Sequence, residues 1–314
     1  MRVCDFPQGR YGNAIFRYLA SSLFCIIYDA KRTYDIDSCD AVMTDTDFIS
    51  WSEQVLQDNI PPLARTQEVG TTESVRDLFG DDISSQDKDT NKTYLFRGYY
   101  QHDAIFLKYR DQLLEYIHAH PEDVLITDGY KPGATGIYHY PVAEYLSREL
   151  LSYDDTSSPD NTAPQYDIVV HLRLEDFVFV NQAIHPKCIS DILYTIENHS
   201  TNTICFVVAK PTTPFEHKYI DYFAKRFNII CESNSPTQDY HIIKNAKTLV
   251  CSRSTMCWAA AFFSNTLETV YFPNYIATSH LHETFKTPIT NTIPYDVVLS
   301  PEHEINYYLD NVSI

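Results

Sequence analysis

Glycine is missing from more than half of this 314-residue sequence, because none of its eight glycines follows Gly136. A G-x-G-x-x-G dinucleotide turn and a Walker P-loop both need several glycines, which let the backbone approach a phosphate closely. Both motifs are therefore excluded from the C-terminal half. A phosphate site in that half must be built from arginine, hydroxyl groups and helix N-termini.

Paired cysteines are also missing. The eight cysteines form no C-x-x-C motif, and three of them, Cys205, Cys231 and Cys251, lie in or at the end of apolar runs typical of strands. This spacing predicts reduced core thiols rather than a disulfide framework or a zinc site.

Long apolar runs and positive charge are scarce. The most apolar stretch, 14–28, contains Arg17, Tyr18 and two serines and is too short to cross a bilayer, and the N-terminus has no secretory core region. We therefore expect a soluble, cytoplasmic protein with no membrane span. The formal net charge of −18 argues against nucleic acid or an anionic membrane as a partner. An anionic small ligand would need a local cluster of positive groups.

The C-terminal half shows a regular alternation of apolar strands and amphipathic helices. Strands are expected at 166–172, 202–209, 227–231, 247–251 and 267–272. A helix begins at the "SPTQ" segment, where Ser235 is the N-cap and Gln238 completes a capping box. Alternation at this spacing predicts an α/β fold with a parallel, doubly wound sheet.

The N-terminal half begins in the same way, with a short strand, a turn at "PQGRYGN" and a helix. A second strand is expected at 92–100, followed by a helix from Gln101 to about His118, whereas 50–91 is polar and hard to assign. The Ser-, Asp- and Pro-rich stretch 152–165 reads as a linker. We therefore predict two domains, 1–155 and 156–314.

Three segments carry candidate functional residues. "GRYGNAIF" (9–16) permits a tight turn before a helix, "HLRLEDF" (171–177) follows a buried strand, and "SRSTMCW" (252–258) follows another and begins a helix. Because the last two follow strands of one sheet, Arg173 and the hydroxyls should meet at one edge. Together they predict a site for an anionic nucleotide.

Each segment also has a purely structural interpretation. The first can be an ordinary strand-to-helix turn, Arg173 can form a bracing ion pair with Asp176, and the hydroxyls after residue 251 can be N-caps. Asp239, in the first turn of a helix, can simply complement the helix dipole. The D-x-D sequences in 34–37 and 44–47 follow no convincing strand, and "HLHE" (280–283) lacks a third metal ligand.

Four segments resemble the α-1,2-fucosyltransferases, in that family's order. "GRYGNAIFRYLA" is similar to G-x-L-G-N-Q-x-F-x-Y-A, and "FRGYYQHDAIF" (96–106) to G-Y-F-Q-S-x-x-Y-F. "HLRLEDF" resembles H-V-R-R-G-D-Y, which the α-1,6- and protein O-fucosyltransferases share in looser form. The segment 239–263 resembles D-F-x-L-M-S-x-C-K-x-x-I-x-x-N-S-S-F-S-W-W-A-A.

The resemblance implies an inverting glycosyltransferase with two Rossmann-like domains that face each other across a cleft. Its substrates would be GDP-fucose and a glycan acceptor, with no metal and no other cofactor; the donor would lie on the C-terminal domain and the acceptor largely on the N-terminal one. The residues that match the family's donor-binding positions, or lie beside them, are His171, Arg173, Asp239, Ser252, Arg253, Ser254, Thr255, Gly12 and Asn13.

Catalysis would combine an arginine with a base. Arg173 would stabilise the charge that grows on the leaving diphosphate. Asp103, His102 or Asp176 could accept the proton of the acceptor hydroxyl, and the sequence does not choose among them.

The sequence departs from the family at the phosphate-binding positions. Leu174 replaces the second arginine, Glu175 the glycine, Arg253 the asparagine of N-S-S and Cys257 the first of two tryptophans. These departures leave open another GDP-sugar or a UDP-sugar as the donor, or a decayed nucleotide- or glycan-binding module. Thermal-shift screening and product formation would separate the alternatives.

Overall fold

The computed structural model describes residues 1–57, 67–68, 92–128, 141–152, 166–197, 202–274 and 286–312. The chain divides into two compact units, Met1–Ser152 and Tyr153–Ile314. Three parts of the chain lie outside the described residues: most of the predicted linker at 152–165, much of the stretch 50–91, and the "HLHE" segment.

The second unit contains a six-stranded parallel sheet in the order β11-β10-β8-β12-β13-β14. Its strands are β8 (Ile168–His171), β10 (Ile204–Val207), β11 (Ile229–Glu232), β12 (Thr248–Val250), β13 (Thr269–Pro273) and β14 (Asn291–Tyr295). Numbered within this unit, the order is 3-2-1-4-5-6, that of the dinucleotide-binding Rossmann sheet. The strand order reverses between β8 and β12.

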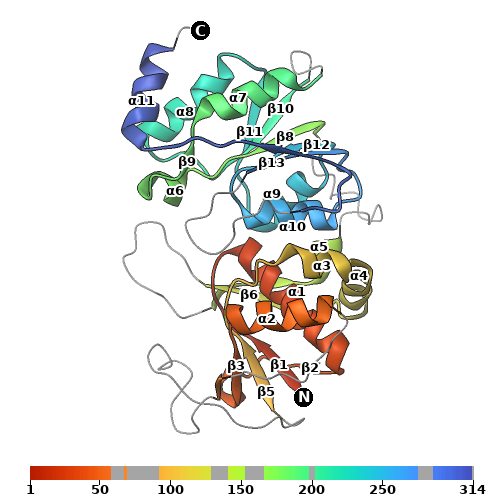
Figure 1. The fold of residues 1–314 in the computed structure, drawn as a ribbon. Coiled ribbons are helices and arrows are strands. Elements are labelled where there is room, and N and C mark those ends of the chain that lie inside the picture. The colour runs from red at the N-terminus through yellow and green to blue at the C-terminus, as the bar shows by residue number, and fades with distance from the viewer. Residues whose placement is uncertain are drawn as a thin grey trace. The chain divides into compact units, whose positions relative to one another are not determined.

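Helices cover both faces of this sheet (Figure 1). One face is covered by α7 (Pro186–Thr195), α8 (Pro214–Ala224) and α11 (Glu302–Asn311), and the other by α9 (Pro236–Lys244) and α10 (Thr255–Phe263). Alternate strand residues such as Ile168 and Val170 pack with α7 and α8 in one apolar cluster. The capping box of Ser235 and Gln238 at the start of α9 is confirmed.

A short segment leaves the sheet after β8. It contains α6 (Glu175–Phe179) and β9 (Ala183–Ile184), which pairs antiparallel with β15 (Leu299–Ser300). Leu172 and Leu174, which flank Arg173, are buried in the cluster beneath α7 and α8.

The first unit has a smaller sheet in the order β2-β1-β5-β3-β4, in which only the β3–β4 pair is antiparallel. Its strands are β1 (Arg2–Asp5), β2 (Lys31–Arg32), β3 (Ala41–Met43), β4 (Gln67–Glu68) and β5 (Thr93–Phe96). The helices are α1 (Tyr11–Tyr28), α2 (Asp45–Leu56), α3 (Asp103–Lys108), α4 (Arg110–Ala119) and α5 (Arg148–Leu151), with a 3₁₀ turn at Ile36–Ser38. A hairpin of β6 (Val124–Asp128) and β7 (Pro141–Leu146) forms a separate sheet.

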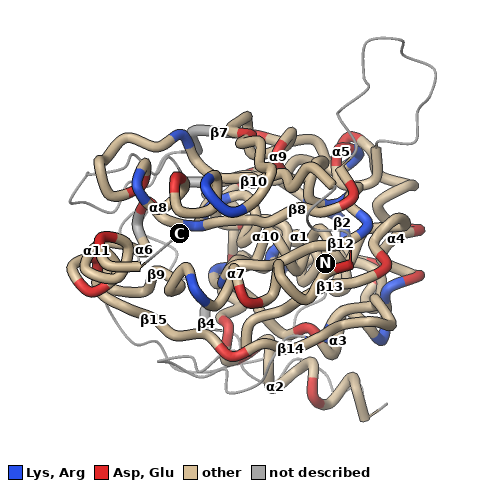
Figure 2. The backbone as a smooth tube through the Cα atoms, turned by 90° about the horizontal axis from the view of Figure 1, so that it is seen from above, with Lys and Arg blue, Asp and Glu red and all other residues tan. Residues whose placement is uncertain are grey.

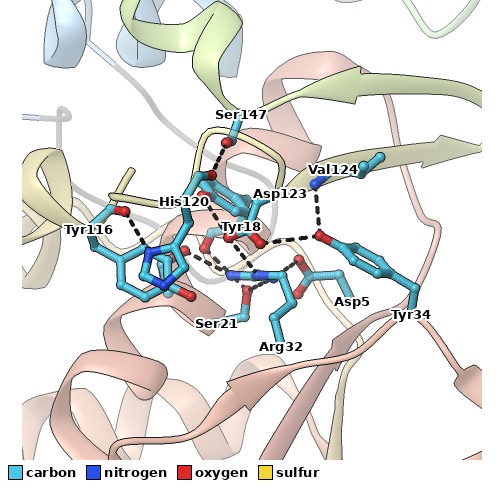
Figure 3. A network of polar contacts seen from close by, with 11 residues as sticks. Asp5, Tyr18, Ser21, Arg32, Tyr34, Tyr116, His120, Asp123, Val124 and Ser147 are labelled. Carbon is cyan, nitrogen blue, oxygen red and sulfur yellow. Dashed lines mark hydrogen bonds and ion pairs between the residues drawn. The ribbon is translucent and has the colours of Figure 1, made fainter. Parts of the chain in front are cut away.

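A buried polar network holds the elements of the first unit together (Figure 3). Arg32 forms ion pairs with Asp5 at 2.7 Å and with Asp123 at 3.1 Å, and its guanidinium also donates to Ser21 and Ser22 of α1. Tyr18 donates to the same Asp123 carboxylate. The side chains of Arg32 and Asp5 are only 4% exposed, so this network connects β1, β2, α1 and the start of β6 in a buried interior.

Two local predictions for the first unit are wrong. The helix expected from Gln101 to about His118 is two helices, which meet at Tyr109. The strand expected over 92–100 ends at Phe96, and Tyr100 adopts a left-handed conformation with φ 50°, so the "GYY" segment lies outside the strand.

The predicted α/β class is confirmed, with a parallel sheet in the second unit as expected and a sheet in the first unit that is parallel except for the β3–β4 pair. The Asp and Glu residues behind the negative net charge are spread over helices and connections of both units (Figure 2). None of the helices in the described ranges combines the length and apolar character needed to cross a membrane. All eight cysteines are free, and six of them are buried.

Candidate active site

The candidate residues of the second unit meet where the strand order of its sheet reverses. His171 is the last residue of β8, and Ser252 follows the neighbouring strand β12. Ligands of open α/β sheets bind in the crevice outside the carboxyl ends of the strands at such a reversal point. The two segments singled out from the sequence therefore lie at the edge of the sheet where a ligand site is expected.

The imidazole of His171 is fixed from one side. Its Nδ1 lies 2.8 Å from the Ser252 Oγ and 3.2 Å from the Cys257 Sγ, and the residue is 9% exposed. Among the described residues, no hydrogen bond involves its Nε2. The ring is therefore held at one nitrogen and has the other left to bind a ligand.

Arg173, which lies two residues beyond the end of β8, stacks on an aromatic ring. Its guanidinium carbon lies 4.3 Å from the centre of the Phe177 ring, and the residue is partly buried. Stacking leaves the planar edge of a guanidinium able to form a fork of hydrogen bonds with two oxygens. Asp176 lies in α6, but its side chain is outside the described residues, so the bracing ion pair stays a prediction.

Arg253 brings a second guanidinium to the β12 connection. It is 6% exposed, and its Nη1 donates to the Gln182 Oε1 at 3.3 Å. Two side chains of the segment after β8 thus contact the arginines: Phe177 stacks on Arg173, and Gln182 accepts from Arg253. Sequence reasoning missed both contacts, because nothing in the chain order relates Gln182 to residue 253.

The hydroxyls at the start of α10 fit both interpretations, helix capping and anion binding. Ser254 is the N-cap, and its Oγ accepts from the backbone N–H of Met256 at 3.2 Å, while Thr255 is the first helical residue. An N-cap serine uses its oxygen as an acceptor and keeps its O–H proton to donate. Ser254 can therefore cap α10 and donate to an anion at the same time.

Asp239 lies in the first turn of α9, within electrostatic range of His171. Its Oδ1 accepts from the backbone N–H of Asn234 at 3.1 Å. Burial raises the pKa of this carboxyl, while the Asn234 contact and the charge of His171 act in the opposite direction. Asp239 and His171 are thus electrostatically coupled, and dipole complementation is not the only interaction of Asp239.

A pair of buried thiols beside His171 is the part of the site that sequence reasoning missed. Cys257 and Cys251 are 0% and 1% exposed, and a hydrogen bond joins their side chains. The only sign of this thiol pair in the sequence was Cys257, which stands where the resembled family has the first of two tryptophans. The neighbouring Trp258 is a fully buried core residue, with its Nε1 donating to the Lys286 carbonyl at 2.8 Å.

The candidates of the first unit cluster at the starts of two helices. Gly12 and Asn13 lie in the first turn of α1, and the Asn13 Oδ1 accepts from the Gln101 Nε2 at 3.2 Å. His102 is the N-cap residue of α3 and Asp103 its first residue. These segments follow β1 and β5, which pair directly, so the chain does bring them together.

Close packing at Gly9 belongs to the same cluster. Gly9 has a φ of 78°, and a Cβ there would lie 2.8 Å from the Asn13 Nδ2. Glycine is required at this turn both for its backbone conformation and for the approach of Asn13.

The D-x-D sequence within 44–47 needs a correction. A strand, β3, does precede it, contrary to the sequence-based expectation. Its two carboxylates nevertheless have structural roles: Asp47 completes a capping box with Thr44, and Asp45 accepts from the backbone N–H groups of Tyr99 and Tyr100. Within the described residues there is no group of three or more His, Cys, Asp or Glu side chains that could hold a metal ion.

Comparisons with known proteins give only distant likenesses. No protein-family model matches the chain, and no curated protein matches it in sequence. Among solved structures, it is similar to the E. coli heptosyltransferase WaaC with ADP, at 11% identity over 99% of each chain with a TM-score of 0.43. It is also similar to E. coli heptosyltransferase WaaC with ADP-2-deoxy-2-fluoro heptose, at 10% identity over 99% of each chain with a TM-score of 0.41. At these scores the likeness carries no conclusion about activity.

Proposed function

We propose that the protein is a glycosyltransferase that transfers a sugar, L-fucose first among the candidates, from a nucleotide diphosphate donor to a hydroxyl of a glycan. The observation that carries this proposal is the pairing of His171 with Ser252 at the β8–β12 reversal point, with Arg173 and Arg253 in the two segments that follow. The resemblance of four segments to the fucosyltransferases also supports it.

The residues present suit the departure of a diphosphate. The acceptor oxygen attacks the anomeric carbon from the side opposite the diphosphate, the bond from that carbon to the diphosphate oxygen breaks, and a base takes the acceptor proton. Negative charge then grows on the leaving oxygen. Guanidinium groups, the Ser254 hydroxyl and the start of α10 are donors that stabilise such charge without a metal.

The base remains an open choice among His102, Asp103 and Asp176. His102 and Asp103 adjoin the Asn13–Gln101 hydrogen bond, and a glycan offers hydroxyl and oxygen groups to such side chains. Replacing each in turn, with turnover as the measurement, identifies the base.

A second donor is favoured by a specific observation. Leu174, which stands where the family has its second arginine, is 3% exposed and packs in the apolar core. The diphosphate therefore meets one guanidinium fewer on this loop than in the family. Another GDP-sugar or a UDP-sugar is the second candidate for this reason.

Thermal unfolding with nucleotides tests the proposal first. GDP should raise the melting temperature more than UDP, ADP or CMP, both with and without EDTA. The shift is measurable, because a ligand at 100 times its Kd adds about 2.7 kcal/mol to the free energy of unfolding. Product formation from GDP-fucose and a panel of galactosides and xylosides follows. Stabilisation by UDP over GDP would select the second donor class, activity lost in EDTA would contradict metal independence, and a protein that binds no nucleotide would not have this function.

A further inference from the structure

The connection between β3 and α2 fixes the turn that follows β5. The Asp45 Oδ1 accepts from the backbone N–H groups of Tyr99 and Tyr100, at 2.7 and 2.6 Å. The Arg97 N–H and the Tyr100 hydroxyl both donate to the Met43 carbonyl. A single carboxylate thus holds two consecutive amides of a turn that lies far from it in the sequence.

These contacts hold the turn in an uncommon backbone conformation. Tyr100 has a φ of 50°, in the left-handed region, and is 1% exposed. A bulky residue adopts this region only where its surroundings enforce it, and such residues are concentrated at active sites and ligand-binding sites. A Cβ at Gly98 would overlap the Asp45 carboxylate, so glycine lets the carboxylate reach the two amides. The turn 98–102 is therefore held in one conformation by Asp45.

This turn contacts a second turn at the carboxyl ends of two paired strands, β1 and β5. Tyr99 is 41% exposed and lies against Gly9 of the turn after β1, where a Cβ would be 3.1 Å from the Tyr99 Cε1. The Gln101 Nε2 donates to the Asn13 Oδ1 of α1 at 3.2 Å. The carboxyl ends of parallel strands are where α/β proteins bind ligands. The two turns therefore bring an exposed aromatic ring and side-chain amides to such a place.

Each turn also contains a buried polar atom that makes no hydrogen bond within the described part of the chain. These atoms are the Gln8 Oε1, after β1, and the His102 Nε2, after β5. Nearly all buried polar atoms in proteins have a partner, so such atoms indicate a position that water or a ligand completes. A sugar suits this set of groups, because its hydroxyls both donate and accept and its C–H face packs on an aromatic ring.

We propose that the turn 98–102 binds the acceptor glycan and that Asp45 is the residue that positions this turn. This inference rests on the proposed function, because it assigns the glycan of that reaction to the turn. The Tyr99 ring packs on an apolar face of the sugar, and Gln8 and His102 form hydrogen bonds with its hydroxyls. Asp45 is a positioning residue, which acts through two backbone amides and does not contact the glycan.

Acceptor kinetics test the positioning role. Asp45→Ala should raise the KM for the acceptor glycoside by about tenfold or more and leave the affinity for GDP within about twofold, because the groups that bind the glycan lose their fixed arrangement. Asp45→Asn should restore most of the acceptor affinity, since the side-chain oxygen of asparagine can accept from both N–H groups. The measurements are the KM in transfer from GDP-fucose to a galactoside or xyloside, and calorimetry of GDP binding.

Asp47→Ala is the matched control. Asp47 lies in the same first turn of α2, and its carboxylate also accepts from a backbone N–H, that of Thr44 at 3.1 Å. This variant should lower the melting temperature, because it removes the capping box, and it should leave the acceptor KM unchanged. An unchanged KM in folded Asp45→Ala, or an equal increase in both variants, would overturn the inference.

Tyr99→Ala supplies a measurement that depends neither on turnover nor on removal of the Asp45 contacts. Saturation-transfer NMR with methyl galactosides and xylosides, on the full chain without donor, should detect binding to the natural sequence. The signal should be largely lost in Tyr99→Ala and kept in Tyr307→Ala, which removes an exposed tyrosine of α11 in the second unit. Equal binding by Tyr99→Ala and the natural sequence would overturn the inference.

The same measurements separate the glycan site from the proposed function. If the natural protein binds a glycoside through Tyr99 but binds no nucleotide, the proposed function fails and the glycan site stands. If it binds nucleotide but none of the glycosides, the glycan site fails and the nucleotide site stands. If it binds neither, both fail.

Discussion

At the scale of single residues, Arg173 gives the most direct test of the proposed chemistry. Arg173→Ala should reduce turnover by roughly a hundredfold or more and weaken donor binding less, because a preorganised charged donor acts mainly on charge that develops in the transition state. Arg173→Lys should recover part of the loss, since an ammonium cannot form the planar fork. Steady-state kinetics with separate kcat and KM values are the measurement.

Arg226 is the control for this prediction. It also stacks on an aromatic ring, with its guanidinium carbon 3.9 Å from the centre of the Tyr222 ring, but it lies in the turn between α8 and the start of β11 and not after β8 or β12. Arg226→Ala should leave turnover unchanged. A folded Arg173→Ala protein with near-normal transfer would rule out the catalytic role, and equal losses of melting temperature in Arg173→Ala and Asp176→Ala would support a bracing ion pair.

At the scale of elements, α9 contains a histidine that makes stability depend on pH. His241 is 6% exposed, and burial, assisted by the charge of Lys244, lowers its pKa to about 4. Folding therefore favours the neutral ring. Stability should be constant above the ordinary pKa of about 6.5 and fall as the pH drops from there towards 4, by up to about 3 kcal/mol.

His241→Phe should remove this slope, because the ring remains but cannot take up a proton. Urea unfolding at several pH values, followed by the fluorescence of Trp258 in a Trp51→Phe background, reports on the second unit. His217→Phe, at an exposed position of α8, should keep the slope. If His241→Phe keeps the slope as well, acid destabilisation has another source.

Some strands and contacts of the second unit were predictable from the sequence, and others were not. β8, β10 and β12 were predictable because strands buried on both faces are continuous apolar runs. β14 was missed, because the edge strand "NTIPY" has exposed residues and a proline. The meeting of His171 and Ser252 followed from strand order, whereas the contact of Cys257 with His171 did not, because a thiol in an apolar helix is indistinguishable from an ordinary core residue.

At the scale of the whole molecule, the Arg32 network carries much of the stability of the first unit. Arg32→Met should lower the unfolding free energy of this unit by about 3–5 kcal/mol, because Asp5 and Asp123 would remain buried without a counter-charge. Trp51 fluorescence in a Trp258→Phe background isolates this unit during urea unfolding. Lys31→Met, at the exposed neighbouring position of β2, should change stability by less than about 1 kcal/mol.

The strand order of the second unit also bears on how this unit forms during synthesis. β8 is the first of its six sheet strands to leave the ribosome, yet both of its neighbours, β10 and β12, come later in the chain. The nascent chain must therefore hold an apolar, unpaired β8 until residues near Val250 emerge. Parallel pairing over such sequence distances is slow and exposes strand edges to aggregation. Chains truncated before β12 should accordingly bind chaperones, whereas chains that extend past α10 should be released.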